Sequence, residues 1–137
     1  MNNIIEEKII FTTGGTGGHI YPALAIAKEF KKKGASILFV GTKHRMEREI
    51  VPSEGYEFIG LDVLPLRSIK SFIKMLKAIK EAVGIVKNEK PTKIIGFGNY
   101  ISIPILVAAK LKKIPYYLQE QNSTMGMANK YFYIGSQ

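Results

Sequence analysis

Short apolar runs alternate with longer amphipathic stretches along nearly the whole chain. Five apolar runs, rich in Ile, Phe and Leu, predict strands at residues 8–12, 36–41, 57–61, 93–98 and 115–119. Stretches with helical spacing predict helices at residues 22–33, 46–51, 69–88, 103–112 and 124–133. The strand runs are continuously apolar, as in sheets that helices cover on both faces. This alternation favours an α/β fold with a doubly wound parallel sheet.

The order of the strands decides where chemistry can gather. Right-handed crossovers favour the order 3-2-1-4-5, with strands numbered along the chain. This order places the carboxyl ends of strands one and four side by side, where open α/β sheets bind their ligands. The first strand is followed by Gly14-Gly15-Thr16-Gly17-Gly18, the fourth by Gly98-Asn99-Tyr100, and the fifth by Glu120-Gln121-Asn122. We expect these three turns to meet at one edge of the sheet.

The glycine-rich turn after the first strand gives the strongest chemical signal. It leads into a helix that we expect to begin at Pro22, because proline suits the first helical position. Unblocked backbone N–H groups and the positive end of a helix then coincide, and such a place favours a phosphate. His19, at the rim of this turn, can accept a proton near neutral pH. A tight turn that binds no ligand is the alternative.

The glycine spacing fits neither of two common phosphate-binding motifs. In the dinucleotide fingerprint, counted from Gly15 and Gly17, the third glycine would fall on Ile20. The nucleoside-triphosphate loop ends in Gly-Lys-Ser/Thr, whereas here Gly18 is followed by His19. The sequence therefore supports neither NAD binding nor ATP hydrolysis.

Composition narrows the class of partner. The chain has 137 residues, 46% of them hydrophobic and 23% charged, which is typical of one globular domain. It has no cysteine, which excludes disulfides and thiolate metal sites and suits a reducing cytoplasm. No stretch reaches about 18 uninterrupted apolar residues, so no membrane span is predicted. The formal net charge of +9 indicates nucleic acid or an anionic membrane surface as a partner.

The longest helical pattern, residues 69–88, has an apolar stripe and a basic side. The stripe comprises Ile69, Phe72, Ile73, Leu76, Ile79, Val83 and Val86. The lysines that lie opposite or near it include Lys70, Lys74, Lys77 and Lys80. Packing against the core explains the stripe, while the lysines also suit an anionic membrane, where each contributes about 1 kcal/mol. Nucleic-acid binding is the weaker alternative, because the lysines are scattered and no recognition module is present.

Several motifs stand at intervals that cover most of the chain. They are Gly14-Gly15-Thr16-Gly17-Gly18-His19-Ile20-Tyr21-Pro22, Gly41-Thr42 with Arg45-Met46-Glu47, Gly96-Phe97-Gly98-Asn99-Tyr100, and Glu120-Gln121-Asn122. In order and spacing they resemble the N-terminal domain of the MurG family of peptidoglycan N-acetylglucosaminyltransferases. Two positions differ from the family pattern: Asn99 stands where a glycine is usual, and Gln119 where histidine is common.

The resemblance implies a fold and an activity. Residues 1–137 would form a single Rossmann-like N-terminal domain, one half of a GT-B glycosyltransferase, without the family's C-terminal donor-binding domain. The implied reaction is an inverting transfer of N-acetylglucosamine from UDP-N-acetylglucosamine to the C4 hydroxyl of lipid I, undecaprenyl-diphospho-muramoyl-pentapeptide. The product is lipid II, a precursor in peptidoglycan synthesis. No cofactor or metal is implied.

The resemblance also implies a location and a requirement. The protein would lie peripherally on the cytoplasmic face of the bacterial cell membrane, bound to its anionic surface and not to nucleic acid. This piece alone would be inactive and would need the missing C-terminal domain in cis or in trans. The alternative is a non-catalytic membrane-recruiting subunit of a split lipid-linked N-acetylglucosaminyltransferase.

The resemblance assigns roles to individual residues. His19 is expected to act as the general base, or instead to hydrogen-bond a sugar or phosphate. Residues expected to bind the acceptor and its diphosphate are Gly15, Gly17, Gly18, Gly98, Asn99, Tyr100 and Glu120, although Glu120 could instead cap the following turn. Residues expected near the donor sugar are Thr16, His19, Tyr100 and Asn122. Independently of the resemblance, the helical pattern of residues 69–88 makes Lys70, Lys74, Lys77 and Lys80 the residues expected to contact the membrane.

Overall fold

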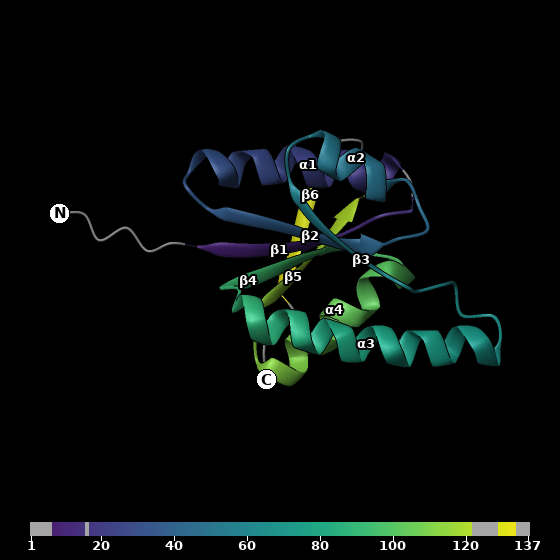
Figure 1. Ribbon diagram of the computed structural model, residues 1–137. Helices are drawn as coiled ribbons and strands as arrows, with labels where there is room; N and C mark the ends of the chain where they lie inside the picture. Colours follow the sequence, from purple (N-terminus) through teal and green to yellow (C-terminus); the bar gives the residue numbers. More distant parts are fainter. Residues whose placement is uncertain (1–6, 16, 122–128, 134–137) are drawn as a thin grey trace.

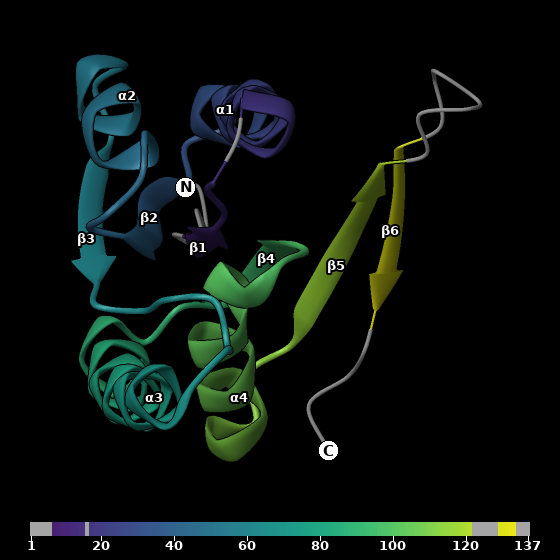
Figure 2. The same ribbon diagram turned by 90° about the vertical axis from the view of Figure 1, so that its right-hand side faces the viewer.

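The computed structural model describes residues 7–15, 17–121 and 129–133. A twisted sheet lies between two layers of helices (Figure 1). Helices α1 (Gly17–Lys32) and α2 (Glu47–Ser53) cover one face of the sheet, and α3 (Ile69–Glu89) and α4 (Ile103–Lys112) cover the other (Figure 2). A short 3₁₀ helix, Tyr100–Ser102, leads into α4. The predicted α/β class is confirmed.

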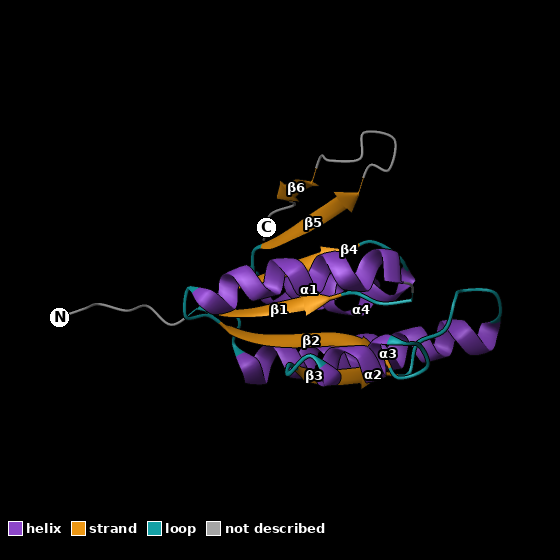
Figure 3. Cartoon of the chain, turned by 90° about the horizontal axis from the view of Figure 1, so that it is seen from above, coloured by secondary structure: helices purple, strands orange, loops and turns teal. Residues whose placement is uncertain are grey.

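The sheet has the order β3-β2-β1-β4-β5-β6 (Figure 3). Its strands are β1 (Lys8–Thr12), β2 (Ser36–Thr42), β3 (Glu57–Leu61), β4 (Lys93–Phe97), β5 (Tyr116–Gln121) and β6 (Asn129–Tyr133). The first five pair in parallel, which confirms the order 3-2-1-4-5, and β6 pairs antiparallel with β5. The carboxyl ends of β1, β4 and β5 therefore lie next to one another at one edge, which we call the carboxyl edge.

The predicted and observed elements differ most at two places: the start of α1 and the region of β6. Helix α1 begins at Gly17, so that Pro22 lies inside it rather than at its first position. The helix tolerates proline there because the missing N–H removes only one hydrogen bond near its start, and because the buried Ile20 and Ala23 hold this end against the sheet. Glycine is a poor helix former, and the sequence pattern therefore placed the start too late.

The prediction of a helix at residues 124–133 is wrong for residues 129–133, the part of this range that the structure describes. Residues 129–133 form β6, whose Phe132 pairs with Leu118 of β5. Residues 124–128 lie outside the described residues. The run Tyr131-Phe132-Tyr133 is rich in aromatics, which favour strands, and β5 offers an edge with which it can pair. Pairing with β5 thus outweighs a weak local helical pattern.

Two apolar layers hold the helices on the sheet. On the α1 side, Phe11 stacks between Phe39 and Phe97, with ring centroids 5.2 and 6.3 Å apart. On the other side, α3 and α4 pack on a cluster that includes Ile10 and Ile94. Aromatic stacking at these distances adds roughly 0.5–1.5 kcal/mol per pair beyond burial. The strands at the switch point are therefore fixed from both faces.

Helix α3 has a defined beginning. The Ser68 hydroxyl accepts a hydrogen bond from the Ser71 N–H at 3.2 Å, and the Ser71 hydroxyl oxygen accepts one from the Ser68 N–H at 3.0 Å. This reciprocal pair is a capping box, which stabilises the first turn of a helix by about 1 kcal/mol. The amino-terminal end of α3 is thus fixed although it projects past the carboxyl edge of the sheet (Figure 1).

Candidate active site

The loop after β1 has a conformation that requires glycine. We call residues 13–18 the glycine loop; Thr16 lies outside the described residues. Gly14 and Gly15 have φ angles of 153° and 93°, which L side chains rarely adopt. A Cβ at Gly14 would also lie 2.1 Å from Oε2 of Glu47. The glycines therefore serve shape and close approach, which is more than a simple turn between strand and helix needs.

The Gly15 amide is already bound within the protein. Its N–H donates to Oε1 of Glu47 at 2.9 Å, and Oε2 of the same carboxylate accepts from the Thr42 N–H at 2.9 Å. Glu47 has no exposed surface. The expectation that the Gly15 N–H binds a diphosphate therefore does not fit this geometry. Gly17 and Gly18 lie in the first turn of α1, where N–H groups have no intrahelical acceptor.

Two polar side chains join the loops after β1 and β4. The Asn99 amide donates to the Gly14 carbonyl at 2.9 Å and accepts from the Ile101 N–H at 2.8 Å. The buried Ser102 hydroxyl lies 3.1 Å from the carbonyl oxygens of both Thr12 and Phe97. Two of the three predicted turns are thus hydrogen-bonded to each other, as their place at the switch point suggested.

His19 lies in the first turn of α1, at the positive end of the helix dipole. Its side chain is half-buried, and its carbonyl accepts a hydrogen bond from the Thr13 hydroxyl at 3.0 Å. This bond attaches the start of α1 to the end of β1. The predicted base therefore stands at the carboxyl edge on a fixed backbone.

The remaining predicted site residues have different surroundings. Gly98 is exposed, and Tyr100 is half-buried and packs on the cluster beneath α3 and α4. The backbone of Glu120 lies in β5, opposite Lys130 of β6. Thr16 and Asn122 lie outside the described residues, as does the side chain of Glu120. The roles predicted for all of them stay predictions.

Gln119 is a buried amide whose polar atoms have no hydrogen-bond partner among the described residues. It is 3% exposed and pairs in register with Phe97, which places it on the α1 face close to the carboxyl edge. An unsatisfied buried polar group costs about 1–3 kcal/mol. Such a group at a ligand-binding edge is suited to meet a ligand or an ordered water.

The amino-terminal half of α3 exposes the apolar side chains that we expected to be core. Ile69, Phe72 and Leu76 are 80%, 54% and 50% exposed. The buried positions are Ser71, Met75, Ala78, Ala82 and Val86. Core packing is therefore the wrong explanation for the first half of the stripe. The apolar pattern did not reveal the buried face because that face includes a polar residue, Ser71, and a small one, Ala78.

The four α3 lysines predicted to contact the membrane are not equivalent. Lys70, Lys77 and Lys80 are exposed, whereas Lys74 is half-buried and its Nζ lies 2.6 Å from Oδ2 of Asp62. Lys74 therefore has a carboxylate partner within the protein.

None of the described helices is long and apolar enough to cross a bilayer.

His44 and Lys74 both contact Asp62, and we call these three residues the ionic cluster. His44 does not lie at the carboxyl edge between β1 and β4. Its Nε2 lies 2.5 Å from Oδ1 of Asp62. Hydrogen bonds from Lys74 and His44 lower the pKa of Asp62 to about 2 from its ordinary 3.8. The His44 side chain is 39% exposed. Its role here is to tie the turn after β2 to α3.

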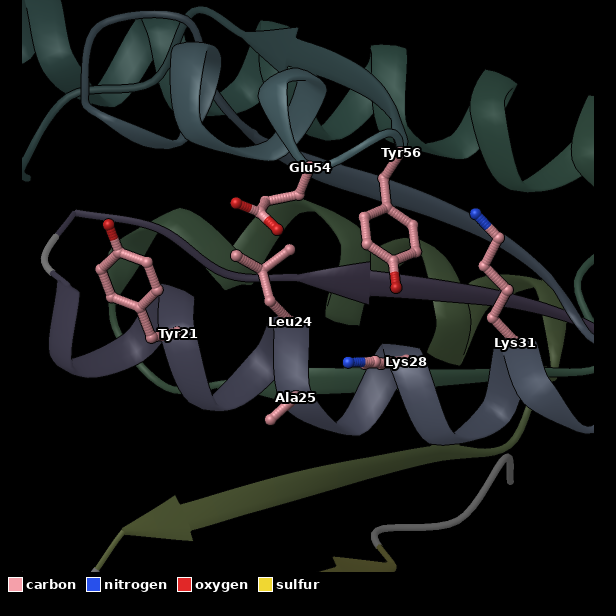
Figure 4. A pocket seen from close by; sticks show the side chains of 7 residues that line it. All are labelled: Tyr21, Leu24, Ala25, Lys28, Lys31, Glu54 and Tyr56. Atoms are coloured by element: carbon pink, nitrogen blue, oxygen red, sulfur yellow. The ribbon is translucent and has the colours of Figure 1, made fainter.

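A hollow of about 550 Å³ lies between α1 and the turn that leads from α2 to β3 (Figure 4). Its lining residues are Tyr21, Leu24, Ala25, Lys28, Lys31, Glu54 and Tyr56. Burial, and then the nearby Glu54 carboxylate, raise the pKa of Tyr56, and Lys31 Nζ lies 5.0 Å from the centre of its ring. None of the predicted site residues lines this hollow.

Arg45 and Glu47 belong to one sequence motif, and the sequence predicts no role for either residue. Arg45 donates from Nη2 to the Gly15 carbonyl at 3.0 Å, and Glu47 binds the Gly15 N–H. A signal was present: an acidic residue five positions after Thr42, in the same motif as an arginine. The signal was weak because carboxylates are seldom buried, and an acidic residue is by default assigned to the surface.

Comparisons with known proteins agree with this architecture. Residues 9–134 match the model of the glycosyltransferase family 28 N-terminal domain. A crystal structure of MurG from Acinetobacter baumannii superposes with a TM-score of 0.74 at 29% identity, over 82% of this chain and 34% of that one. The calicheamicin glycosyltransferase CalG4 shares the fold at a TM-score of 0.61 and 15% identity.

The curated relatives are named UDP-N-acetylglucosamine–N-acetylmuramyl-(pentapeptide) pyrophosphoryl-undecaprenol N-acetylglucosamine transferases. The protein from Fusobacterium nucleatum is 54% identical over 127 residues, 93% of this chain and 36% of that protein. The protein from Halothermothrix orenii is 45% identical over 129 residues, 90% of this chain and 35% of that protein. This chain thus spans about a third of their length. Since the family model matches most of its residues, the chain belongs to glycosyltransferase family 28, of which it is the N-terminal domain.

Proposed function

We propose that this chain is the acceptor-binding domain of an inverting transferase. The enzyme would move N-acetylglucosamine from UDP-N-acetylglucosamine to the C4 hydroxyl of lipid I and so form lipid II. The names of the curated relatives support the reaction. The observation that supports the place of the site is the hydrogen-bonded junction of the loops after β1 and β4, at the switch point of the sheet.

The acceptor's diphosphate would bind at the start of α1. Gly17 and Gly18 direct first-turn N–H groups and the positive end of the helix dipole toward the carboxyl edge. Glycine allows a phosphate to approach the backbone closely because it has no side chain. This placement differs from the sequence-based expectation in one respect: Gly15 contributes the shape of the loop and not a donor.

His19 would be the general base of this reaction. The acceptor hydroxyl attacks the anomeric carbon from the face opposite UDP, its proton passes to the imidazole, and the bond between that carbon and the UDP oxygen breaks. The configuration at the anomeric carbon is inverted because attack and departure occur on opposite faces. This role is supported by the position of His19 in the first turn of α1, the helix start at which we propose the diphosphate to bind.

The amino-terminal half of α3 would contact the membrane that holds the lipid acceptor. Ile69, Phe72 and Leu76 are exposed apolar side chains on a helix end that projects past the sheet (Figure 1). Lys70, Lys77 and Lys80 stand on the same helix and are exposed. Apolar insertion together with lysine attraction suits peripheral binding to an anionic leaflet, here the cytoplasmic face of the bacterial membrane.

Transfer activity tests this function directly. The chain would be joined to the C-terminal part of the Fusobacterium nucleatum relative, and formation of lipid II from lipid I and UDP-N-acetylglucosamine would be measured. We expect transfer, and a 10²–10⁴-fold lower kcat in His19→Ala if the imidazole takes the proton. A His19→Ala effect confined to KM would assign this residue to binding. Absence of transfer in a chimaera that folds and binds UDP-N-acetylglucosamine would contradict the proposed reaction.

The alternative, a non-catalytic recruiting subunit, has no support among the relatives, which are named as transferases. The same chimaera separates the two functions. Activity when both parts are joined, and none when they are mixed as separate chains, is expected for a domain of a single-chain transferase.

A further inference from the structure

Glu47 is a buried carboxylate that joins two turns of the sheet. Its Oε1 accepts the Gly15 N–H of the β1–α1 loop, and its Oε2 accepts the Thr42 N–H at the end of β2. Both bonds are 2.9 Å long, and the side chain has no exposed surface. A buried carboxylate is strongly unfavourable unless hydrogen bonds replace its water. These two backbone amides supply that replacement, and in return they are fixed.

Two glycines form the slot that Glu47 fills. A Cβ at Gly14 would lie 2.1 Å from Oε2, and one at Gly41 would lie 2.8 Å from Cγ of Glu47 and 2.7 Å from the Thr13 carbonyl oxygen. No other residue type fits either position without displacing the acid or the backbone. The glycine loop, the end of β2 and Glu47 are therefore matched in shape.

Arg45 binds the backbone carbonyl of Gly15, the residue whose N–H is bound by Glu47. Its Nη2 donates to the Gly15 carbonyl at 3.0 Å. Both the N–H and the C=O of Gly15 are thus bound by side chains from one short segment, residues 45–47. This fixes the orientation of the backbone at Gly15, with its N–H turned into the protein.

We infer that Glu47 is a positioning residue that sets the glycine loop before any ligand binds and directs a bound anion to the first turn of α1. The second half of this inference rests on the proposed diphosphate site. A glycine-rich loop without such a tether would lose much conformational freedom on binding, and this loss would weaken the affinity. With Glu47 in place, the backbone at Gly15 is already fixed, and the first-turn N–H groups of Gly17 and Gly18 are left to face the ligand.

The isosteric substitution Glu47→Gln tests the tether. Glutamine offers one acceptor oxygen and one NH₂ group, so that only one of the two amides can stay bound. Glu49→Gln is the matched control, because Glu49 is an exposed acid on the same helix. The first readout is hydrogen exchange of the Gly15 and Thr42 amides in this chain, followed by NMR. We expect at least tenfold faster exchange at one of them in Glu47→Gln and no change in Glu49→Gln.

The second readout is titration with inorganic pyrophosphate. We expect Glu47→Gln to bind it about tenfold more weakly than the parent chain, while the core amides of Phe39 and Ile95 stay protected. A merely structural role would instead lower protection throughout the sheet. Unchanged exchange at both Gly15 and Thr42, or a loosened loop with unchanged pyrophosphate affinity, would overturn the inference.

Arg45→Ala provides a second variant in case Glu47→Gln does not fold. Arg45 is exposed, and Arg48→Ala removes an equal charge from an exposed neighbour and serves as its control. We expect faster Gly15 exchange and weaker pyrophosphate binding in Arg45→Ala than in Arg48→Ala, and equal behaviour of the two would contradict the inference. If the parent chain binds no pyrophosphate, the proposed diphosphate site fails, and the exchange experiment still decides whether Glu47 presets the loop.

Discussion

The glycine loop and the amino-terminal half of α3 lie toward the same end of the sheet but are built in opposite ways. At the glycine loop, side chains from neighbouring turns bind the backbone: Glu47, Arg45 and Asn99 all contact Gly14 or Gly15. On α3, large apolar side chains such as Ile69 and Phe72 face outward. The backbone of the first region is hydrogen-bonded within the protein, whereas the second region exposes apolar side chains to its surroundings. A lipid-linked substrate needs both a fixed site and a surface that reaches the membrane.

The largest effect is expected from filling the slot at the glycine loop. Gly14→Ala would force a Cβ into the Glu47 carboxylate and strain a φ of 153°. We expect the free energy of unfolding to fall by about 2–5 kcal/mol, from strain and overpacking together. Gly34→Ala is the control, because Gly34 has a φ of 94° but open space around it, and strain alone costs about 1–2 kcal/mol. Urea unfolding measures both, and equal losses would show that the loop is not closely packed.

Removing the exposed apolar surface should affect membrane binding and leave stability unchanged. The double variant Ile69→Ser/Phe72→Ser is expected to bind anionic vesicles at least about tenfold more weakly, since burial of one large apolar side chain stabilises by about 1.5–3 kcal/mol. Stability should stay within about 0.5 kcal/mol because both residues are exposed. Leu111→Ser, at a 63% exposed position on α4, controls for loss of apolar surface in general. Vesicle co-sedimentation gives the affinities, and equal loss in the control would refute a specific α3 contact.

A smaller effect is expected where Asn99 joins the two loops. Asn99→Ala removes the hydrogen bonds to the Gly14 carbonyl and the Ile101 N–H. We expect a loss of about 1–3 kcal/mol for the two bonds, at roughly 0.5–1.5 kcal/mol per bond. Asn88→Ala, at an exposed position near the end of α3, is the control. Thermal unfolding measures the difference, and a loss equal to that of the control would mean that the junction adds no stability.

The smallest effect concerns the ionic cluster that holds α3 to the turn after β2. Asp62→Asn should lower stability by at most about 1 kcal/mol at pH 7, because the pair with Lys74 is partly exposed to solvent. The pKa of Asp62 is lowered from 3.8 to about 2, so its contribution is present above about pH 4 and is lost as the pH falls through 2. Urea unfolding at pH 7 and at pH 2 should therefore show a difference from the parent chain that disappears at the lower pH. Glu81→Gln, an exposed acid on α3, should show no such pH dependence.

Much of the fold followed from the sequence because it depends on local pattern and chain handedness. Continuous apolar runs gave the five parallel strands, and right-handed crossovers gave their order and the junction at the switch point. The bounds of α1 did not follow, since Gly17 and Gly18 have low helix propensity and this end of the helix is held by the buried Ile20 and Ala23. Nor did β6, which depends on pairing with β5.

The site was predictable in place but not in detail. The glycines marked the carboxyl edge, yet the partner of Gly15 lies 32 residues further along the chain, and no local pattern reveals that contact. On α3 the apolar pattern was real, but it could not say which face meets the sheet. The buried face includes the small residues Ala78 and Ala82, whereas the larger Ile69 and Phe72 face outward.

The shared slot of Gly14, Gly41 and Glu47 means that these positions form one unit of evolutionary change. If the acid were lost, the steric reason for a bare backbone at position 14 would disappear with it, while the dihedral strain would persist. Substitutions there should consequently be non-additive in a double-mutant cycle, with the second costing less than the first. Divergent sequences would then be expected to keep the trio whole or to abandon it together.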